Sequence, residues 1–195
     1  MVNIAVVYHS GYGHTARQAQ AVADGAAGIA GVRAQLVPVE NVEQHWRDLE
    51  SADAIVFGSP TYMGSVSAPF KAFMDKSSKA WAAQQWKDKI AAGFTNSASH
   101  SGDKLNTLIQ LAVFAAQHGM HWVSLGLLPG NNSRQGSPED LNRLGSYLGA
   151  MAQSDSDAAP EIAPTGSDLR TAAHLGRRVA EAALGFALAR ERKAA

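Results

Sequence analysis

The sequence contains no cysteine. Thiol catalysis, disulfide bonds and iron–sulfur ligation are therefore excluded, and any redox chemistry must come from a bound cofactor. The 17 basic and 17 acidic side chains give a formal net charge of zero. This balance argues against nucleic acid as a partner, because phosphate backbones require a basic face. It also argues against a strongly acidic electron carrier that docks basic partners.

Long apolar runs are missing as well. No stretch approaches the ~20 apolar residues that a membrane helix needs. Strand-like sequence begins at residue 3, with no basic-then-apolar leader before it. We therefore expect a cytoplasmic protein with no membrane partner. Its 195 residues, 46% of them hydrophobic, are enough for a single domain over 1–195 with a substantial core.

Strand-like apolar runs and helix-like segments alternate along the chain. The expected strands are residues 3–8, 32–39, 53–58, 89–95 and 120–124. The expected helices are residues 13–27, 68–75, 103–117 and 167–190, with a loop and a short helix over 40–50. This alternation predicts an α/β fold in which a mostly parallel sheet has helices on both faces.

The segment from Gly126 to Thr165 is rich in Gly, Pro, Ser and Asn and is weakly patterned. Such a length is unusual for an ordinary loop and typically marks function or an interface. We expect this segment to be largely irregular, with at most a short helix from Pro138 to Leu148. Glu191 to Ala195 are expected to fray.

The first expected loop joins a strand to a helix through the sequence Tyr8-His-Ser-Gly-Tyr-Gly-His-Thr15. The first N–H groups of a helix have no partner within the helix, and the helix dipole makes that end positive. A phosphate placed there satisfies several donors at once. Glycines allow the backbone to wrap closely, and the hydroxyl and imidazole groups add donors. On these residues alone, a turn that merely caps a helix stays an alternative.

Two further loops change that balance. In an open parallel sheet, ligands bind beyond the carboxyl ends of the strands. The loops 9–15, 59–67 and 95–102 follow three expected strands and should lie at one edge, which indicates a single phosphorylated ligand. The P-loop motif Gly-x-x-x-x-Gly-Lys-Ser/Thr and the dinucleotide motif Gly-x-Gly-x-x-Gly are both absent. No histidines have metal-ligand spacing with a carboxylate, so we expect no metal site.

These loops resemble the flavodoxin-like fold, specifically the WrbA-like branch of NAD(P)H:quinone oxidoreductases and NADPH-dependent FMN reductases. The resemblance spans residues 3 to about 125, with a weaker echo over 168–181. It implies a three-layer α/β/α sandwich with a five-stranded parallel sheet in the order 2-1-3-4-5. The motifs that carry it are Tyr8-His-Ser-Gly-Tyr-Gly-His-Thr15, Gly58-Ser-Pro-Thr-Tyr-Met-Gly64 with Ser67-Ala-Pro69, Phe94-Thr-Asn-Ser97 and Gln117-His-Gly-Met120.

The resemblance implies FMN as the cofactor. The residues that match the family's phosphate loop are Ser10, Tyr12, Gly13, His14 and Thr15. Those that match the loop against the flavin ring are Pro60, Thr61, Tyr62, Met63 and Gly64. Those that match the loop around the ribityl chain and pyrimidine edge are Thr95, Asn96, Ser97, Ala98 and Gly102. Many relatives have arginine and phenylalanine where this chain has Tyr62 and Met63, so the electron acceptor stays open.

His118 matches a family histidine close to the flavin, often reached from a neighbouring subunit, which gives it an implied catalytic role. A plain role at a helix C-terminus, where positive charge is favoured, is its alternative. The implied function is transfer of two electrons, as hydride, from NADPH or NADH to a quinone-type acceptor by a ping-pong mechanism. A homodimer or homotetramer is implied too. The alternatives are a flavodoxin-type electron carrier, a flavin or azo reductase, and a module that binds another phosphorylated ligand.

Overall fold

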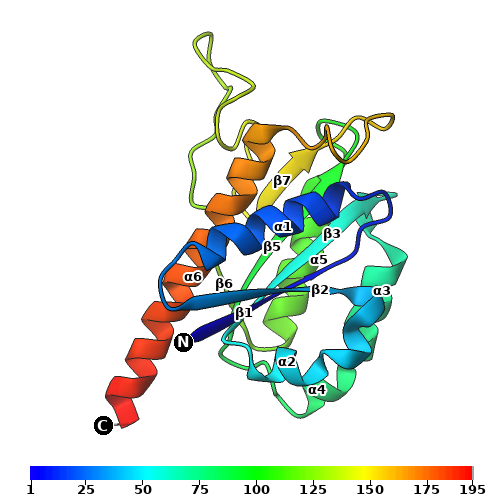
Figure 1. Cartoon of the computed structure of the whole chain (residues 1–195). Helices are drawn as coiled ribbons and strands as arrows, with labels where there is room; N and C mark the ends of the chain where they lie inside the picture. Colours follow the sequence, from blue (N-terminus) through cyan, green and yellow to red (C-terminus); the bar gives the residue numbers. More distant parts are fainter. Residues whose placement is uncertain (195) are drawn as a thin grey trace.

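The computed structural model describes the backbone of residues 1–194 and the side chains of residues 1–190 (Figure 1). Its centre is a sheet of parallel strands in the order β2-β1-β3-β5-β6. Val6 of β1 pairs with Leu36 of β2 on one side and with Val56 of β3 on the other. The strand bounds are β1 Val2–Tyr8, β2 Val32–Pro38, β3 Ala54–Tyr62, β4 Ser65–Val66, β5 Ile90–Ser97, β6 His121–Trp122 and β7 Ala150–Gln153. The predicted flavodoxin-like α/β fold and its strand order are confirmed.

The fifth strand is divided into two pieces. β6 pairs with Ile90 and Ala91 at the start of β5, and β7 pairs in parallel with Phe94 to Ser97 at its end. Residues 123–149 lie between the two pieces, and Figure 1 shows part of this segment projecting from the body of the protein. The predicted strand over 120–124 is therefore too long, and the sheet contains more strands than the five expected.

Helices cover both faces of the sheet, which explains why the central strands are apolar on both sides. α1 and α6 lie together on one face (Figure 1), where they bury residues such as Val22 and Val179 against β1 and β3. The opposite face is covered by α2, α3 and α5, which pack around Phe57 and Trp86. The helix bounds are α1 His14–Ala27, 3₁₀-helix η1 Val39–Gln44, α2 Trp46–Ser51, α3 Ala68–Lys76, α4 Ser78–Ala82, α5 Lys104–Gln117 and α6 Gly166–Ala194.

Three sequence predictions need correction. Residues 138–148 form turns and not a helix. The segment 126–165 also contains a strand, β7, because the end of β5 still offers backbone partners along one side. α6 continues to Ala194 where fraying from Glu191 was expected, and Ala195 lies outside the described residues.

Two glycines allow α1 and α6 to pack at close range. A Cβ atom at Gly25 would overlap the backbone carbonyl of Ala173, and one at Gly176 would overlap that of Val22. A backbone group cannot move aside as the tip of a flexible side chain can, so any side chain here must push the helices apart. The contact lies in the second half of α1 and fixes this helix closely against α6.

We predict that Gly176→Ala lowers the free energy of unfolding by about 1–3 kcal/mol, the usual cost of overpacking. Gly185→Ala is the matched control, because a Cβ there meets no atom within 4 Å. That change should raise stability by about 0.5–1 kcal/mol through helix propensity. Urea denaturation of the two variants measures both effects. Equal stability of the two variants would contradict the close helix contact.

Candidate functional site

The three predicted loops meet around one cavity of about 500 Å³ at the carboxyl ends of β1, β3 and β5. The cavity contains every residue predicted to bind the cofactor except Gly13 and Thr95. It also contains three serines that were not predicted. The lining residues are Ser10, Tyr12, His14, Thr15, Pro60, Thr61, Tyr62, Met63, Gly64, Asn96, Ser97, Ala98, Ser99, Gly102, Ser154 and Ser156.

The first loop presents unsatisfied donors to the cavity. Gly13 precedes α1 with φ of 88°, a left-handed conformation that favours glycine. Gly13, the N-cap residue of α1, has no side chain to cap the helix, and Ser10 Oγ accepts a hydrogen bond from the backbone N–H of Ala16 at 3.1 Å. Within the described part of the chain, no acceptor meets the backbone N–H of Gly13, His14 or Thr15. This donor set fits an anionic group such as a phosphate.

Residues 59–67, predicted to be a loop, instead contain the end of β3, a turn and β4, which together form a β-hairpin. β3 continues through Pro60 to Tyr62 and then pairs with β4, with Thr61 opposite Val66. Met63 and Gly64 form the turn, with φ of 48° and 76°. Asn106 Nδ2 donates to the Gly64 carbonyl at 2.6 Å, which fixes the tip to α5.

Tyr62 joins the second loop to the first. Its ring meets the ring of Tyr12 edge to face at 6.3 Å between centroids. A Cβ at Gly11 would lie 2.6 Å from the Tyr62 hydroxyl, so only glycine leaves room for this contact. Burial raises the pKa of the Tyr62 phenol, which therefore stays protonated at neutral pH. Tyr12 is 76% exposed and leaves this side of the cavity open to solvent.

The third loop is braced from β7 and from the residues that follow it. Gln153 Nε2 donates to the Ala98 carbonyl at 2.9 Å, and Ser154 Oγ donates to Asn96 Oδ1 at 3.1 Å. Ser154 and Ser156 enter the cavity because β7 ends at the same sheet edge as the other parallel strands. Ligands bind beyond the carboxyl ends of parallel strands, and this rule also applies to the loop after β7. The sequence analysis did not predict that loop, because the segment that contains β7 is weakly patterned.

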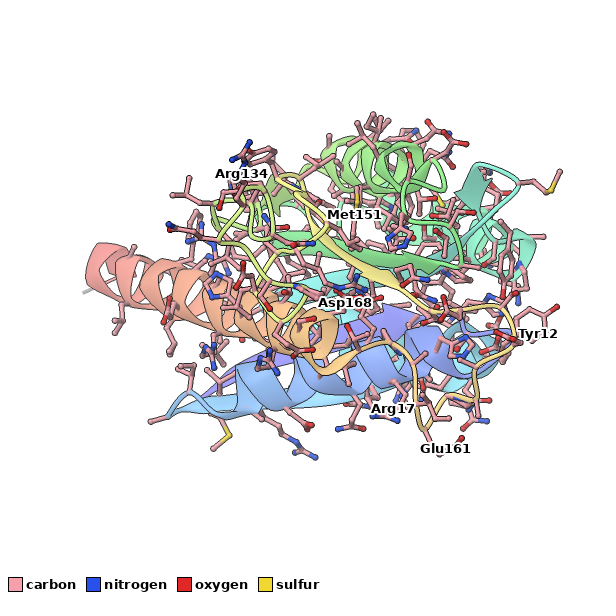
Figure 2. The ribbon with its side chains drawn as sticks, turned by 90° about the horizontal axis from the view of Figure 1, so that it is seen from above. Tyr12, Arg17, Arg134, Met151, Glu161 and Asp168 are labelled. Carbon is pink, nitrogen blue, oxygen red and sulfur yellow. The ribbon has the colours of Figure 1, made fainter. Side chains whose placement is uncertain are left out.

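The segment after β7 crosses the start of α1. His14 Nε2 lies 2.8 Å from the Ala158 carbonyl, and Arg17 Nη1 donates to the Pro160 carbonyl at 2.6 Å. Figure 2 shows this segment turning beside Tyr12 and then running past Glu161 and Arg17 to α6. The segment therefore covers part of the first turn of α1.

Gly13 and Thr95 support the cavity without lining it. Gly13 contributes the turn before α1 described above. Thr95 is fully buried, and its Oγ1 lies 2.8 Å from Thr61 Oγ1, which in turn lies 2.8 Å from Thr107 Oγ1. This chain of hydroxyls ties together β5, β3 and α5 directly beneath the hairpin tip.

His118 lies away from the cavity of its own chain. It follows α5, whose first residue lies beside the third loop, so the helix carries it about 20 Å toward the opposite edge of the sheet. It is buried, stacks on Trp86 at 4.3 Å, and its Nε2 lies 3.0 Å from Ser77 Oγ. Burial lowers its pKa to about 4. The expected approach to a neighbouring subunit's flavin stays a prediction.

Within the part of the chain that the structure describes, no group of His, Asp and Glu could hold a metal ion, and no helix is long and apolar enough to cross a bilayer.

Residues 34–133 match the family model described as NADPH-dependent FMN reductase. This chain belongs to that family. A flavodoxin named FldP from Pseudomonas aeruginosa is 48% identical over 184 residues, which cover 92% of this chain and 96% of the relative. An NAD(P)H dehydrogenase (quinone) from Archaeoglobus fulgidus is 33% identical over 205 residues, with 94% and 98% covered.

A crystal structure of a WrbA-like flavodoxin protein from Agrobacterium tumefaciens superposes on this chain with a TM-score of 0.75 and 44% sequence identity. The match covers 95% of this chain and 99% of that one. The resemblance to the flavodoxin-like, WrbA-type family is thus confirmed, and the family is one of FMN-binding oxidoreductases.

The buried state of His118 generates a prediction about acid stability. The pKa of the His118 imidazole is about 4 in the folded protein, whereas its ordinary value is 6.5. Between these two pH values the unfolded chain therefore binds a proton that the folded chain does not bind. Stability is therefore lost as the pH falls from about 6.5 toward 4, by up to about 3 kcal/mol.

His118→Gln removes this titration, so the variant should lose less stability than the wild type between pH 7 and pH 4.5. Urea midpoints at the two pH values give the comparison, and each protein serves as its own reference for the lost ring packing. The same loss in both proteins would show that His118 does not titrate in this way.

Proposed function

We propose that this protein is an FMN-dependent oxidoreductase that passes two electrons from NAD(P)H to a small quinone-type acceptor. The observation that supports it is the single cavity in which three loops meet, with the unsatisfied N–H groups of α1 at one end. A mononucleotide is the ligand class that fits a phosphate site at one end and a cavity of this size beside it.

Different residues of the three loops would hold the different parts of FMN. The phosphate would be held by the backbone from Gly13 to Thr15 and by the hydroxyls of Ser10 and Thr15. The ring would lie against Pro60 to Gly64, and Asn96 to Ala98 would meet the ribityl chain and the pyrimidine edge. FMN, when bound, supplies the two-electron chemistry that the cysteine-free chain itself lacks.

The protein's own contribution is positioning and access. The hairpin tip, fixed by Asn106, and the third loop, braced by Gln153, are rigid walls that keep the cavity shaped before a ligand arrives. The open side beside Tyr12 is one entrance. NAD(P)H and the acceptor would use it in turn, because one entrance to one cavity favours a ping-pong order.

A flavodoxin-type electron carrier is the second candidate, because the relative named FldP is 48% identical over nearly the whole chain. A net charge of zero does not suit docking to a basic protein partner, which weighs toward small-molecule acceptors. A flavin or azo reductase is distinguished from a quinone reductase by its acceptor alone. The cytoplasmic location stays a prediction.

The predicted homodimer or homotetramer also stays a prediction. Leu105, Ile109 and Val113 follow one another at helical spacing on α5, and all three are exposed. An apolar stripe of this kind is compatible with burial against another subunit. Light scattering gives the number of subunits directly.

We predict that the protein binds FMN at least about 100-fold more tightly than riboflavin, which lacks the phosphate. Two hydrogen bonds to a charged group at about 1.5 kcal/mol each correspond to that factor. Titration of flavin fluorescence measures both affinities. Thr15→Val should narrow the gap, whereas Thr171→Val, the same change at a buried α6 position outside the cavity, should not. Equal affinities for the two flavins would contradict a phosphate site at α1.

Anaerobic NADPH should rapidly bleach the flavin absorbance of the FMN-loaded protein, and benzoquinone should restore it. Stopped-flow mixing measures the rate, and parallel double-reciprocal plots would identify the ping-pong order. Turnover with benzoquinone, free FMN and an azo dye then ranks the acceptors. Failure of both NADPH and NADH to reduce the bound flavin would reject the reductase and favour the carrier.

A further inference from the structure

Lys104 occupies an unusual place behind the third loop. It is the first residue of α5, and its side chain is fully buried. Its Nζ donates to Ser97 Oγ at 2.8 Å and to the Ser99 carbonyl at 2.6 Å. Both acceptor residues line the cavity. The ammonium group therefore lies immediately behind the cavity wall.

Two physical effects oppose a charged lysine at this point. Burial penalises the ammonium group and lowers its pKa to about 8. The start of a helix is its positive end, where a cation is unfavourable and an anion is preferred. A lysine that served only to tie the loop to α5 would be replaced at less cost by a neutral donor.

Nearby carboxylates do not cancel this charge. Asp168 is the closest anion in influence, but it already accepts two hydrogen bonds from Arg143, at 2.8 and 2.7 Å, within a buried pair. The backbone N–H of Gln153 donates to the same carboxylate at 2.9 Å. Asp103, the preceding residue, is exposed to solvent. Among residues 1–190, the hydrogen-bond acceptors of Lys104 Nζ are both neutral.

We propose that Lys104 is a fixed positive charge set behind the cavity wall, and that it favours the reduced form of FMN over the oxidised form. The inference rests on the proposed function. Reduction adds negative charge to the flavin, and a buried cation attracts such charge more strongly than an exposed one because water screens it less. Lys104 acts by its charge from behind the loop of Ser97 to Ser99, so it sets a potential and does not touch the reacting atoms.

The test compares the FMN midpoint potential of four proteins by equilibration with a reference dye. Lys104→Met removes the charge and the hydrogen bonds, and Lys104→Gln removes the charge but keeps a donor. Lys87→Met is the matched control, because Lys87 is exposed and lies before β5, at the opposite edge of the sheet from the cavity. Thermal unfolding of each protein without FMN accompanies the potentials.

Both Lys104 variants should lose about tenfold of the wild type's preference for reduced over oxidised FMN. For a two-electron couple this is a fall of about 30 mV in midpoint potential, and Lys87→Met should show none. Lys104→Met should unfold at the same or a higher temperature than the wild type, since removal of a buried charge without a charged partner relieves a desolvation penalty.

Unchanged potentials in both Lys104 variants, with FMN bound, would overturn this inference alone. A fall in Lys104→Met but not in Lys104→Gln would also overturn it, because it would assign the effect to the hydrogen bonds and not to the charge. If the wild type itself does not bind FMN, the proposed function fails and this inference fails with it.

Discussion

The unsatisfied backbone N–H groups at the start of α1 are the constraint on which the cavity depends. They exist because the N-cap residue of α1 is Gly13, which has no side chain to accept from them, and because Ser10 Oγ accepts only from the N–H of Ala16. Toward its other end, α1 is held against α6 by the contact through Gly25 and Gly176, which brings two backbones together without side chains between them. The segment after β7 then covers the same helix end through Ala158 and Pro160. The site is thus the product of one helix end and of everything that holds it in place.

The parallel sheet adds the remaining walls, and the sequence made this part predictable. Apolar runs of strand length, each followed by glycine and hydroxyl residues, predict a parallel sheet and the edge at which its loops meet. The first, second and third loops were all found in this way. The strand order is implied only by the resemblance to the flavodoxin-like fold. β7 was not predicted, because Ala150–Gln153 is only four residues long and contains no β-branched or aromatic residue, so its β-propensity does not indicate a strand. β7 forms because the edge of β5 is free at this point, which only the tertiary structure shows. Ser154 and Ser156, which follow β7, were therefore not predicted to line the cavity.

Other departures have equally local causes. β3 continues through Pro60, which pairs with Asn96 as the last residue of β3 along β5. Proline has no backbone N–H to donate and is tolerated where the pairing ends. In its own chain His118 is buried against Trp86 at the far end of α5, and its implied approach to the flavin of a neighbouring subunit stays a prediction. The sequence does not indicate a functional role for Lys104, because a lysine at the start of a helix is usually exposed to solvent. Only the side-chain contacts show that its ammonium group is buried beside the cavity.

Hydrogen–deuterium exchange with and without FMN tests whether three loops separated in sequence form one FMN site. We expect FMN to slow exchange together in residues 10–15, 61–64 and 96–102, and to leave the region around His118 unchanged in the isolated subunit. Protection confined to a single loop, or centred on another face of the sheet, would contradict the account.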